Sequence, residues 1–543
     1  MRGEQRCRGV AAVAAVGLLA WSVVGCSGSG PPGSGSSGSG SARTARDSSP
    51  GRARGSRSAN PPPTGSISPW DWPTYGHDAQ HSFHGRTTLT AATASQLTQA
   101  WAFPTGDAVT ATPTVVHGTV YVGSWDGFFY ALDLRTGRLR WKFALHRQHA
   151  IQPHPGEQPR DATSDGGMVT SSAWFEPGDG HRPDLVLFGG GYTLYALDAA
   201  TGRPFWFHDY TGRPDKAPDP DHDEARIFSS PVVVAGKVIV GVSTDGQNHH
   251  RGYVVAARLS DGEPAWTHET NVDVSGTVAN DGCGNVWSSA TVLPRQGLVA
   301  VAVADCKFSN PPPDSETVLA LRVADGTMAW RFRPPRLDDK CDFDFGASVN
   351  AGLDRDGSAS FLGVGAKDGT YYALDPRTGI LRWSTNVVFG GFAGGFIATT
   401  AYDGQRVYGS TALGDFGRFE SNGPQVCAPG NPTDRPFQEP TVHALDGRTG
   451  KVIWQAEGAP SFGPTTVAGD LTFNGTALTD KVLVREASSG RVVKEIVVAA
   501  PCWSGVATVG DAVVFGTGAS HQGTSAGVFA YAPGGRSPTV PTG

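Results

Sequence analysis

The hydrophobic pattern of the chain consists of short runs in which β-branched and aromatic residues alternate with polar ones. The clearest copy spans residues 111–141, ATPTVVHGTVYVGSWDGFFYALDLRTGRLRW, and is interrupted by the turn pairs His117-Gly118 and Asp126-Gly127. Alternation between two-residue turns that contain glycine is typical of β-hairpins. The pattern therefore predicts short antiparallel strands joined by tight turns.

The end of this copy, a glycine turn followed four residues later by tryptophan, returns along the chain. Residues 486–494 keep the turn without the tryptophan, and residues 504–531 keep only the strands. The tryptophans are 53 to 71 residues apart, so loops of different length are inserted into a constant unit. The complete copies end at Trp141, Trp206, Trp266, Trp330, Trp383 and Trp454.

A unit of four strands cannot bury both of its faces alone, so the units must stack on one another. Radial stacking gives a β-propeller, in which only short strand edges stay unpaired. The alternative, a β-solenoid, usually has shorter and more uniform repeats. A tryptophan at a constant place after a glycine turn is expected to pack against the adjacent blade, which is a structural role.

The phrase A-x-D-x-x-T-G-x-x-x-W resembles the repeat of pyrroloquinoline quinone (PQQ) propellers, which are eight-bladed rings. The resemblance covers Trp70 to Tyr531, and residues 70–78 are similar to the segment that opens these domains. It implies an all-β fold with a single eight-bladed propeller over residues 70–533 and a disordered tail at 534–543. In the family, N-terminal sequence completes the last blade.

The N-terminus is predicted to be a targeting segment. Three arginines precede an apolar run, Val10 to Val24, that is too short to span a membrane comfortably. The following Val-Val-Gly-Cys resembles a bacterial lipobox, which implies a signal peptide over 1–25 and lipidation of Cys26; an uncleaved anchor and an ordinary signal peptide are the alternatives. Residues 26–69, rich in Gly, Ser and Pro, are expected to form a disordered tether. We thus expect export and anchoring at the outer face of the cell membrane.

The net charge bears on the expected partners, and the cysteines bear on haem attachment and disulfides. The net charge of −6 provides no basic surface, so nucleic acid is not an expected partner, and we expect a monomer. No C-x-x-C-H motif for covalent haem occurs. Apart from Cys7 and Cys26, five cysteines allow two disulfides and one thiol; Cys283 and Cys306 flank one strand and are the favoured pair, although spacing leaves the pairing open.

Within the PQQ propellers, the closest resemblance is to polyvinyl-alcohol-dehydrogenase-like quinoproteins. It is carried by residues 228–233, 251–255, 284–287, 342–348 and 365–369. PQQ is a planar tricarboxylate, which suits an aromatic face, basic side chains and a hard cation. Alcohol oxidation also needs a carboxylate base and a Lewis acid. The resemblance implies that Trp287 stacks on PQQ, that Lys367 and Arg251 contact its oxygens, and that Asp342 or Asp344 accepts the substrate proton.

The loops expected to bind Ca²⁺ depart from the family pattern. The third-blade loop, 243–248, offers only Asp245 where family enzymes usually place a glutamate. The fourth-blade loop carries Lys307, whose charge would repel the cation, and Asn310 supplies an amide only if the register shifts. A fused cytochrome is also absent from the sequence, so an active enzyme would need an external electron acceptor.

Three functional hypotheses follow. The first is a membrane-tethered, PQQ-dependent dehydrogenase that oxidises alcohol or polymer hydroxyl groups. The second is a non-catalytic propeller used as a binding or assembly scaffold in the cell envelope, because an outer-membrane assembly lipoprotein has the same blade repeat. An exopolymer-binding or sensor lipoprotein is a third hypothesis. The first predicts that Trp287, Lys367, Asp342 and Asp245 meet at one mouth of the central channel.

Overall fold

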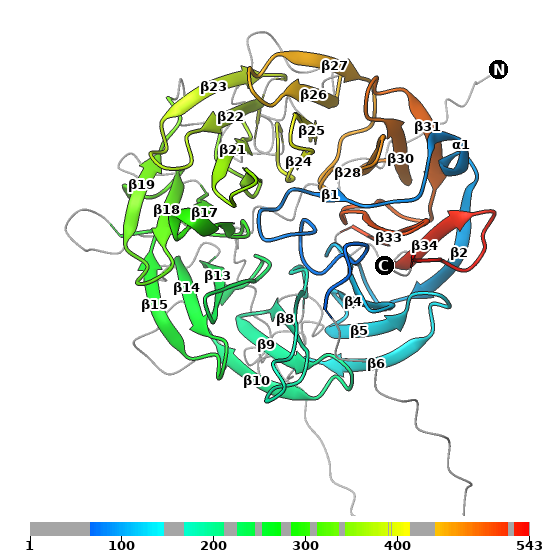
Figure 1. Ribbon diagram of the computed structural model, residues 1–543, viewed down its shortest axis with the longest axis horizontal. Coiled ribbons are helices and arrows are strands. Elements are labelled where there is room, and N and C mark those ends of the chain that lie inside the picture. The colour runs from blue at the N-terminus through cyan, green and yellow to red at the C-terminus, as the bar shows by residue number, and fades with distance from the viewer. Residues whose placement is uncertain are drawn as a thin grey trace, which may run out of the picture.

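The chain is arranged as a ring of sheets around a central axis (Figure 1). The computed structural model describes residues 66–145, 168–210, 225–244, 252–272, 284–304, 312–335, 343–388, 390–391, 394–412, 440–519 and 526–541. These residues form eight sheets of four or five strands, and consecutive strands within a blade are antiparallel. The predicted all-β, eight-bladed propeller is therefore confirmed.

Each blade contributes one strand to the inside of the ring and one to its rim. The innermost strands are β3 (Thr114–Val116), β7 (Trp174–Glu176), β12 (Val232–Val234), β16 (Thr291–Leu293), β20 (Asn350–Leu353), β24 (Ala401–Tyr402), β28 (Thr466–Ala468) and β32 (Ala507–Val509). The second strands are β4 (Thr119–Gly123), β8 (Leu185–Gly190), β13 (Lys237–Thr244), β17 (Leu298–Ala302), β21 (Ala359–Gly365), β25 (Arg406–Ser410), β29 (Leu471–Gly475) and β33 (Ala512–Thr517).

The two outer layers complete the blades. The third strands are β5 (Phe128–Asp133), β9 (Thr193–Asp198), β14 (Tyr253–Arg258), β18 (Val318–Arg322), β22 (Thr370–Leu374), β26 (Val442–Asp446), β30 (Lys481–Glu486) and β34 (Gly527–Pro533). The rim strands are β6 (Leu139–Ala144), β10 (Pro204–Asp209), β15 (Pro264–Glu269), β19 (Met328–Phe332), β23 (Leu381–Asn386), β27 (Val452–Ala456), β31 (Val492–Val497) and β2 (Leu97–Pro104).

A few short elements lie outside this scheme. They are β1 (His84–Gly85), which pairs in parallel with β28, β11 (Ala225–Arg226), the helix α1 (Ala91–Ala94) and the 3₁₀ turn η2 (Pro294–Gln296). Across the ranges given above, neither helix has the length or the apolar character needed to cross a bilayer.

The repeated tryptophans pack between neighbouring blades, as predicted. Trp266 of β15 donates a hydrogen bond from Nε1 to the Val323 carbonyl oxygen of the next blade, at 3.0 Å. Its ring covers Gly326, where a Cβ atom would lie 2.5 Å from Trp266 Cε3 and φ is +74°. A side chain at Gly326 would therefore collide with the ring, which explains why glycine and tryptophan recur together. The same stacking joins Trp141 to Gly202, Trp206 to Gly262, Trp330 to Gly379, Trp383 to Gly450 and Trp454 to Gly490.

The ring is closed by its N-terminal strand, as the family resemblance implies. β2 pairs antiparallel with β34 and forms the rim of the blade that begins with β32. Its Trp101 donates to the Leu134 carbonyl oxygen at 2.7 Å and covers Gly137, so it supplies the tryptophan that the last repeat lacks.

The C-terminal tail differs from its prediction. Residues 534–541 were expected to be disordered, but Thr539 and Arg536 bind the Asp511 carboxylate, with Thr539 N–H donating at 2.7 Å and Arg536 Nη2 at 3.0 Å. Gly534 N–H also donates to the Gln96 carbonyl oxygen at 3.0 Å. The first two contacts hold the tail on its own blade, and the third joins it to the residue that precedes β2. A local pattern of Gly, Ser and Pro does not reveal such contacts.

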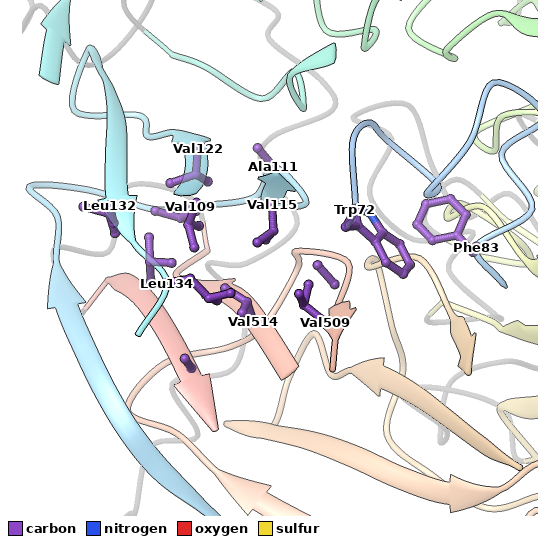
Figure 2. Close-up of a cluster of buried hydrophobic side chains, with 14 of the residues drawn as sticks. Trp72, Phe83, Val109, Ala111, Val115, Val122, Leu132, Leu134, Val509 and Val514 are labelled. Carbon is purple, nitrogen blue, oxygen red and sulfur yellow. The ribbon is translucent and has the colours of Figure 1, made fainter. Parts of the chain in front are cut away.

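A segment that precedes β2, residues 72–84, crosses the middle of the ring (Figure 1). Its carbonyl oxygens at Ala79, Gln80, Ser82 and Phe83 accept hydrogen bonds of 2.8–2.9 Å from the innermost strands β16, β20, β24 and β28. Trp72 also exchanges two backbone hydrogen bonds with β3. Figure 2 shows Trp72 and Phe83 in one apolar cluster with side chains of the first and last blades. We call residues 72–84 the plug.

Candidate functional site

Three residues singled out by the sequence lie at the same end of the ring. Trp287 precedes the innermost strand β16, Asp344 precedes β20, and Lys367 follows the second strand β21. Because neighbouring strands of a blade are antiparallel, the start of an innermost strand and the end of a second strand lie at the same end. The fold thus brings together residues that are 80 positions apart in sequence.

The side chains of these three residues are in contact. Lys367 Nζ lies 2.7 Å from Asp344 Oδ1, and the two side chains are only 3% and 1% exposed. The same ammonium lies 5.0 Å from the centroid of the Trp287 ring, which is within the range of a cation–π interaction. Lys367 also donates its backbone N–H to the Asp344 carbonyl oxygen at 2.9 Å. The site is therefore a buried ion pair placed against an aromatic face.

Burial makes this pair energetically different from a surface salt bridge. Removing two charges from water costs several kcal/mol per ion, and their attraction offsets that cost only when the geometry is good. In a poorly polarisable interior, each charge also acts more strongly on its neighbours than it would in water. A buried ion pair is therefore weak evidence for a stabilising role, and the Asp344–Lys367 pair is a candidate for a functional one.

Local structure fixes both charged residues. Lys367 lies in the turn between β21 and β22, where Asp368 Oδ1 accepts the Thr370 N–H at 2.7 Å and Gly369 N–H donates to the Ala366 carbonyl oxygen at 3.1 Å. Asp344 is followed by the fully buried Phe345, which anchors the approach to β20. Both backbones are thereby held where the side chains meet.

A belt of hydroxyl groups directly beneath the site connects successive blades. Ser230 N–H donates to Ser289 Oγ at 2.8 Å, Ser289 N–H to Ser348 Oγ at 2.8 Å, and Ser348 N–H to Thr399 Oγ1 at 3.0 Å. Tyr75 of the plug reaches the same Thr399 oxygen at 2.8 Å. Ser289 and Ser348 follow Trp287 and Asp344 closely, so the belt holds the segments that carry them. The near-constant spacing of Ser172, Ser230, Ser289 and Ser348 is the sequence signal that could have revealed it.

Most of the other predicted site residues lie outside the described ranges. Of the two alternatives for the base, the structure describes Asp344, which contacts Lys367, whereas Asp342 falls in an interval that it does not describe. The remaining predicted residues outside the described ranges are Arg251, Asp245, Asn310, Cys26, Cys283 and Cys306. Within the part of the chain that is described, no three His, Cys, Asp or Glu side chains are grouped as metal ligands.

One cysteine is described, and it is a free thiol. Cys502 is fully buried, and burial raises the pKa of its thiol to about 12. Its Sγ donates to the Gly516 carbonyl oxygen at 3.3 Å. Cys502 therefore behaves as a small core residue of the last two blades.

Comparison with known proteins agrees with this fold. The family model described as the glucose/ethanol/alcohol dehydrogenase β-propeller domain matches residues 72–386, and that of the outer membrane protein assembly factor BamB matches residues 314–502. A polyvinylalcohol dehydrogenase of a Pseudomonas species is 25% identical over 383 residues, covering 64% of this chain and 56% of that protein. The polyvinylalcohol dehydrogenase of Sphingopyxis sp. (strain 113P3) is 24% identical over 447 residues, covering 75% of this chain and 61% of that protein.

The solved structures show the same architecture. Quinohemoprotein alcohol dehydrogenase from Comamonas testosteroni superimposes with a TM-score of 0.66 at 20% identity, covering 87% of this chain and 82% of that one. The chain spans less than two thirds of the length of the two polyvinylalcohol dehydrogenases that it matches. The resemblance to PQQ-repeat propellers is confirmed, and because the first family model covers more than half of the chain, this protein belongs to the glucose/ethanol/alcohol dehydrogenase β-propeller family.

Proposed function

We propose that this protein is a PQQ-dependent dehydrogenase that oxidises hydroxyl groups of an alcohol or a hydroxylated polymer. The observation that carries the proposal is the buried contact among Asp344, Lys367 and Trp287, with 2.7 Å between the charged atoms. The similarity to two polyvinylalcohol dehydrogenases supports the choice of a polymer hydroxyl as one substrate.

The described residues fit a planar, anionic quinone. Trp287 offers an aromatic face, and its buried Nε1 has no hydrogen-bond partner among the described residues, so it is available to a ligand oxygen. Lys367 places a positive charge at the same ring. PQQ, when bound, supplies the quinone that takes up the two electrons released by the alcohol. Trp287 and Lys367 are the residues that would hold it.

The chain's own residues would then handle the proton. We propose that Asp344 accepts the hydroxyl proton of the substrate, which is the role of a carboxylate base. Lys367 fixes the orientation of Asp344 through Oδ1 and balances its negative charge. Because both groups are almost fully buried, bulk water is kept from the carboxylate. The proposal also includes residues that lie outside the described ranges. Asp342 is the alternative base, Arg251 is a second contact to PQQ, and Asp245 and Asn310 are the cation ligands.

The proposal is tested by titrating the full chain with PQQ in the presence of Ca²⁺ or a lanthanide. We expect saturable binding with one PQQ per chain and reduction of an electron-accepting dye when an alcohol or polyvinyl alcohol is added. Trp287→Ala should bind PQQ about tenfold more weakly, since aromatic stacking contributes up to about 1.5 kcal/mol, whereas Trp287→Phe should bind nearly as well as wild type.

Two outcomes would contradict the enzyme hypothesis. The absence of saturable PQQ binding with either cation would leave the assembly-scaffold alternative, which the match of residues 314–502 to the BamB family model favours. Binding without dye reduction by any hydroxyl substrate would instead identify a ligand-binding propeller.

The electron acceptor is proposed to be a separate protein or quinone.

We also propose that the chain is exported and held at the membrane through lipid on Cys26, as a monomer. The lipobox resemblance implies more than one acyl chain on this cysteine, and stable anchoring requires more than one. Metabolic labelling with an alkyne fatty acid should mark the wild type and Cys7→Ser but not Cys26→Ser, and only the last should leave the membrane fraction. Equal labelling of the Cys26→Ser variant would show that the anchor is elsewhere or absent.

A further inference from the structure

We propose that three glycines following β23, Gly390, Gly391 and Gly395, are positioning residues for Lys367. They belong to the sequence VVFGGFAGGF, which links the rim strand β23 to the innermost strand β24. The described parts of this segment lie against the turn of residues 366–369, which carries Lys367. We call Gly390, Gly391 and Gly395 the glycine clamp. The inference about Lys367 stands on geometry, and its catalytic meaning rests on the proposed function.

Hydrogen bonds attach the clamp to this turn on one side and to the next blade on the other. Gly391 N–H donates to the Lys367 carbonyl oxygen at 3.1 Å, and Phe396 N–H donates to the Ala366 carbonyl oxygen at 3.0 Å. The Gly395 carbonyl oxygen accepts a hydrogen bond of 2.8 Å from Ala412, just beyond β25 of the following blade. The clamp therefore ties the Lys367 turn to a neighbouring blade.

The closeness of this contact requires glycine. A Cβ atom at Gly390 would overlap the Lys367 carbonyl oxygen and the Asp368 Cα atom. At Gly395, where φ is +58°, a Cβ atom would lie 2.5 Å from the Lys367 carbonyl oxygen and 2.6 Å from that of Ala366. These are backbone atoms, so a side chain could be accommodated only by displacing the turn itself.

The turn meets the clamp with a glycine of its own. Gly369 has a φ of +79°, and a Cβ atom there would overlap the carbonyl oxygen of Val388, which lies between the end of β23 and the clamp. Val387 N–H donates to the Gly369 carbonyl oxygen at 2.9 Å. Two stretches of backbone are thus packed face to face, with hydrogen in place of side chains between them.

The consequence is that both peptide groups of Lys367 are fixed. Its N–H donates to the Asp344 carbonyl oxygen at 2.9 Å, and its own carbonyl oxygen accepts from Gly391 of the clamp. A lysine side chain has several rotatable bonds, so fixing its backbone is what allows the ammonium to hold a single position. We infer that displacement of the turn moves the ammonium away from both Asp344 Oδ1 and the Trp287 ring.

The glycines at the tryptophan docking positions have a different explanation. Gly326 and its counterparts are required by the stacked indole ring of the preceding blade. At Gly390 and Gly395, the three atoms nearest to a Cβ all belong to the backbone of the turn that bears Lys367. Blade packing therefore accounts for the first group and the position of Lys367 accounts for the second.

The test uses the full chain without cofactor and measures how fast Lys367 is acylated, by mass spectrometry. Gly390→Ala and Gly395→Asn are the clamp variants; asparagine tolerates a positive φ, so the second variant adds the contact with little backbone strain. Gly404→Asn is the matched control, because Gly404 has a φ of +95° and nothing within 4 Å of its Cβ position. Lys481, which is 39% exposed, serves as the internal reference.

We expect Lys367 to react slowly in the wild type and in the control, and at least about tenfold faster in both clamp variants, while Lys481 is unchanged. Hydrogen exchange should show that the increase is confined to residues 366–369 and their contacts, which separates displacement of the turn from general unfolding. Slow acylation of Lys367 in folded clamp variants would overturn the inference.

The result is independent of whether PQQ binds, so the two proposals can fail separately. Faster acylation in the clamp variants together with no PQQ binding by the wild type would keep the clamp and reject the enzyme. Unchanged acylation together with PQQ-dependent dye reduction by the wild type would reject the clamp and keep the enzyme. If both hold, the clamp variants should lose PQQ affinity by about the same factor as each other, and the Gly404→Asn control should not.

Discussion

Replacing Lys367 by methionine is expected to destabilise the protein by about 3–5 kcal/mol, because the Asp344 carboxylate would stay buried without its ammonium partner. The double variant Lys367→Met, Asp344→Asn should recover much of that loss, since a neutral amide is far less costly to bury. The quantity to measure is the free energy of unfolding in urea of the protein without cofactor.

The chain contains a matched control for this experiment. Lys481 Nζ lies 2.7 Å from Glu495 Oε2, the same separation as in the buried pair, but the two side chains are 39% and 49% exposed. Lys481→Met should therefore change the free energy of unfolding by less than about 1 kcal/mol. Equal losses in Lys367→Met and Lys481→Met would mean that burial does not govern the Asp344–Lys367 pair.

The same substitutions separate stability from catalysis. On the proposed function, Asp344→Asn removes the base and should lower dye reduction by a factor of about 10² to 10⁴ while the protein still binds PQQ. Full dye reduction in a PQQ-loaded Asp344→Asn variant would assign the base elsewhere, with Asp342 as the alternative that the sequence provides.

Acidification from pH 7 to pH 4.5 is expected to lower the free energy of unfolding through two buried histidines. Burial lowers the pKa of His443 to about 3 and that of His81 to about 4, both from an ordinary value of 6.5. The unfolded chain takes up protons on these residues below pH 6.5 while the folded chain does not, so stability falls as the pH falls through this window. Each unit of pKa difference is equivalent to about 1.4 kcal/mol at full extent.

The contribution of His443 can be isolated by a variant that keeps its hydrogen bonds. The ring nitrogens of His443 contact Thr411 Oγ1 at 3.2 Å and Gln455 Nε2 at 2.9 Å, and glutamine can reach similar partners. The His443→Gln variant should lose about 2 kcal/mol less than the wild type over this pH range. The exposed His181→Gln should follow the wild-type curve. Parallel curves for all three proteins would show that His443 does not titrate in this way.

The carboxylates of the repeated glycine turns interfere little with this measurement. Hydrogen bonds from Thr449 to Asp446, within one of the repeated glycine turns, hold the pKa of that carboxyl below its ordinary value of 3.8. The pKa of Asp375 is lowered in an equivalent turn, where burial opposes the shift and hydrogen bonds from Arg382 and Thr378 outweigh it. Because both groups lose their charge below pH 4, their stabilising contribution is retained across the window in which the histidines act.

The amino-acid sequence was sufficient to predict the features that repeat along the chain and those marked by a short motif of the family. The repeated glycine turns and tryptophans predicted the propeller fold and the docking of one blade on the next. Both features depend on residues that lie a fixed distance apart in every repeat. The resemblance also selected Trp287, Lys367 and Asp344, which the fold brings into contact. Asp342 and Asp344 could not be distinguished because both alternate with phenylalanine in the same short phrase.

The features that sequence missed depend on pairs that are distant along the chain. Tyr75 and Thr399, which join the plug to the hydroxyl belt, are 324 positions apart, and no local pattern relates them. Trp101 did not appear as the tryptophan of the last blade because its strand lies at the other end of the chain. The glycine clamp was hidden for another reason: glycine is so common here that only the close approach of two backbones identifies the important ones.

Closure of the ring by β2 has a consequence for how the protein is made. The plug and β2 are synthesised before the strands of all eight inner layers, whereas β34, the partner of β2, follows them. Thr87 Oγ1, for example, donates to the Gly510 carbonyl oxygen 423 positions away. Until β34 is made, β2 has no partner strand. The incomplete ring also has open strand edges, which are templates for aggregation. β2 therefore stays unpaired during most of the synthesis of the propeller. The ring can close only after β34 has been made.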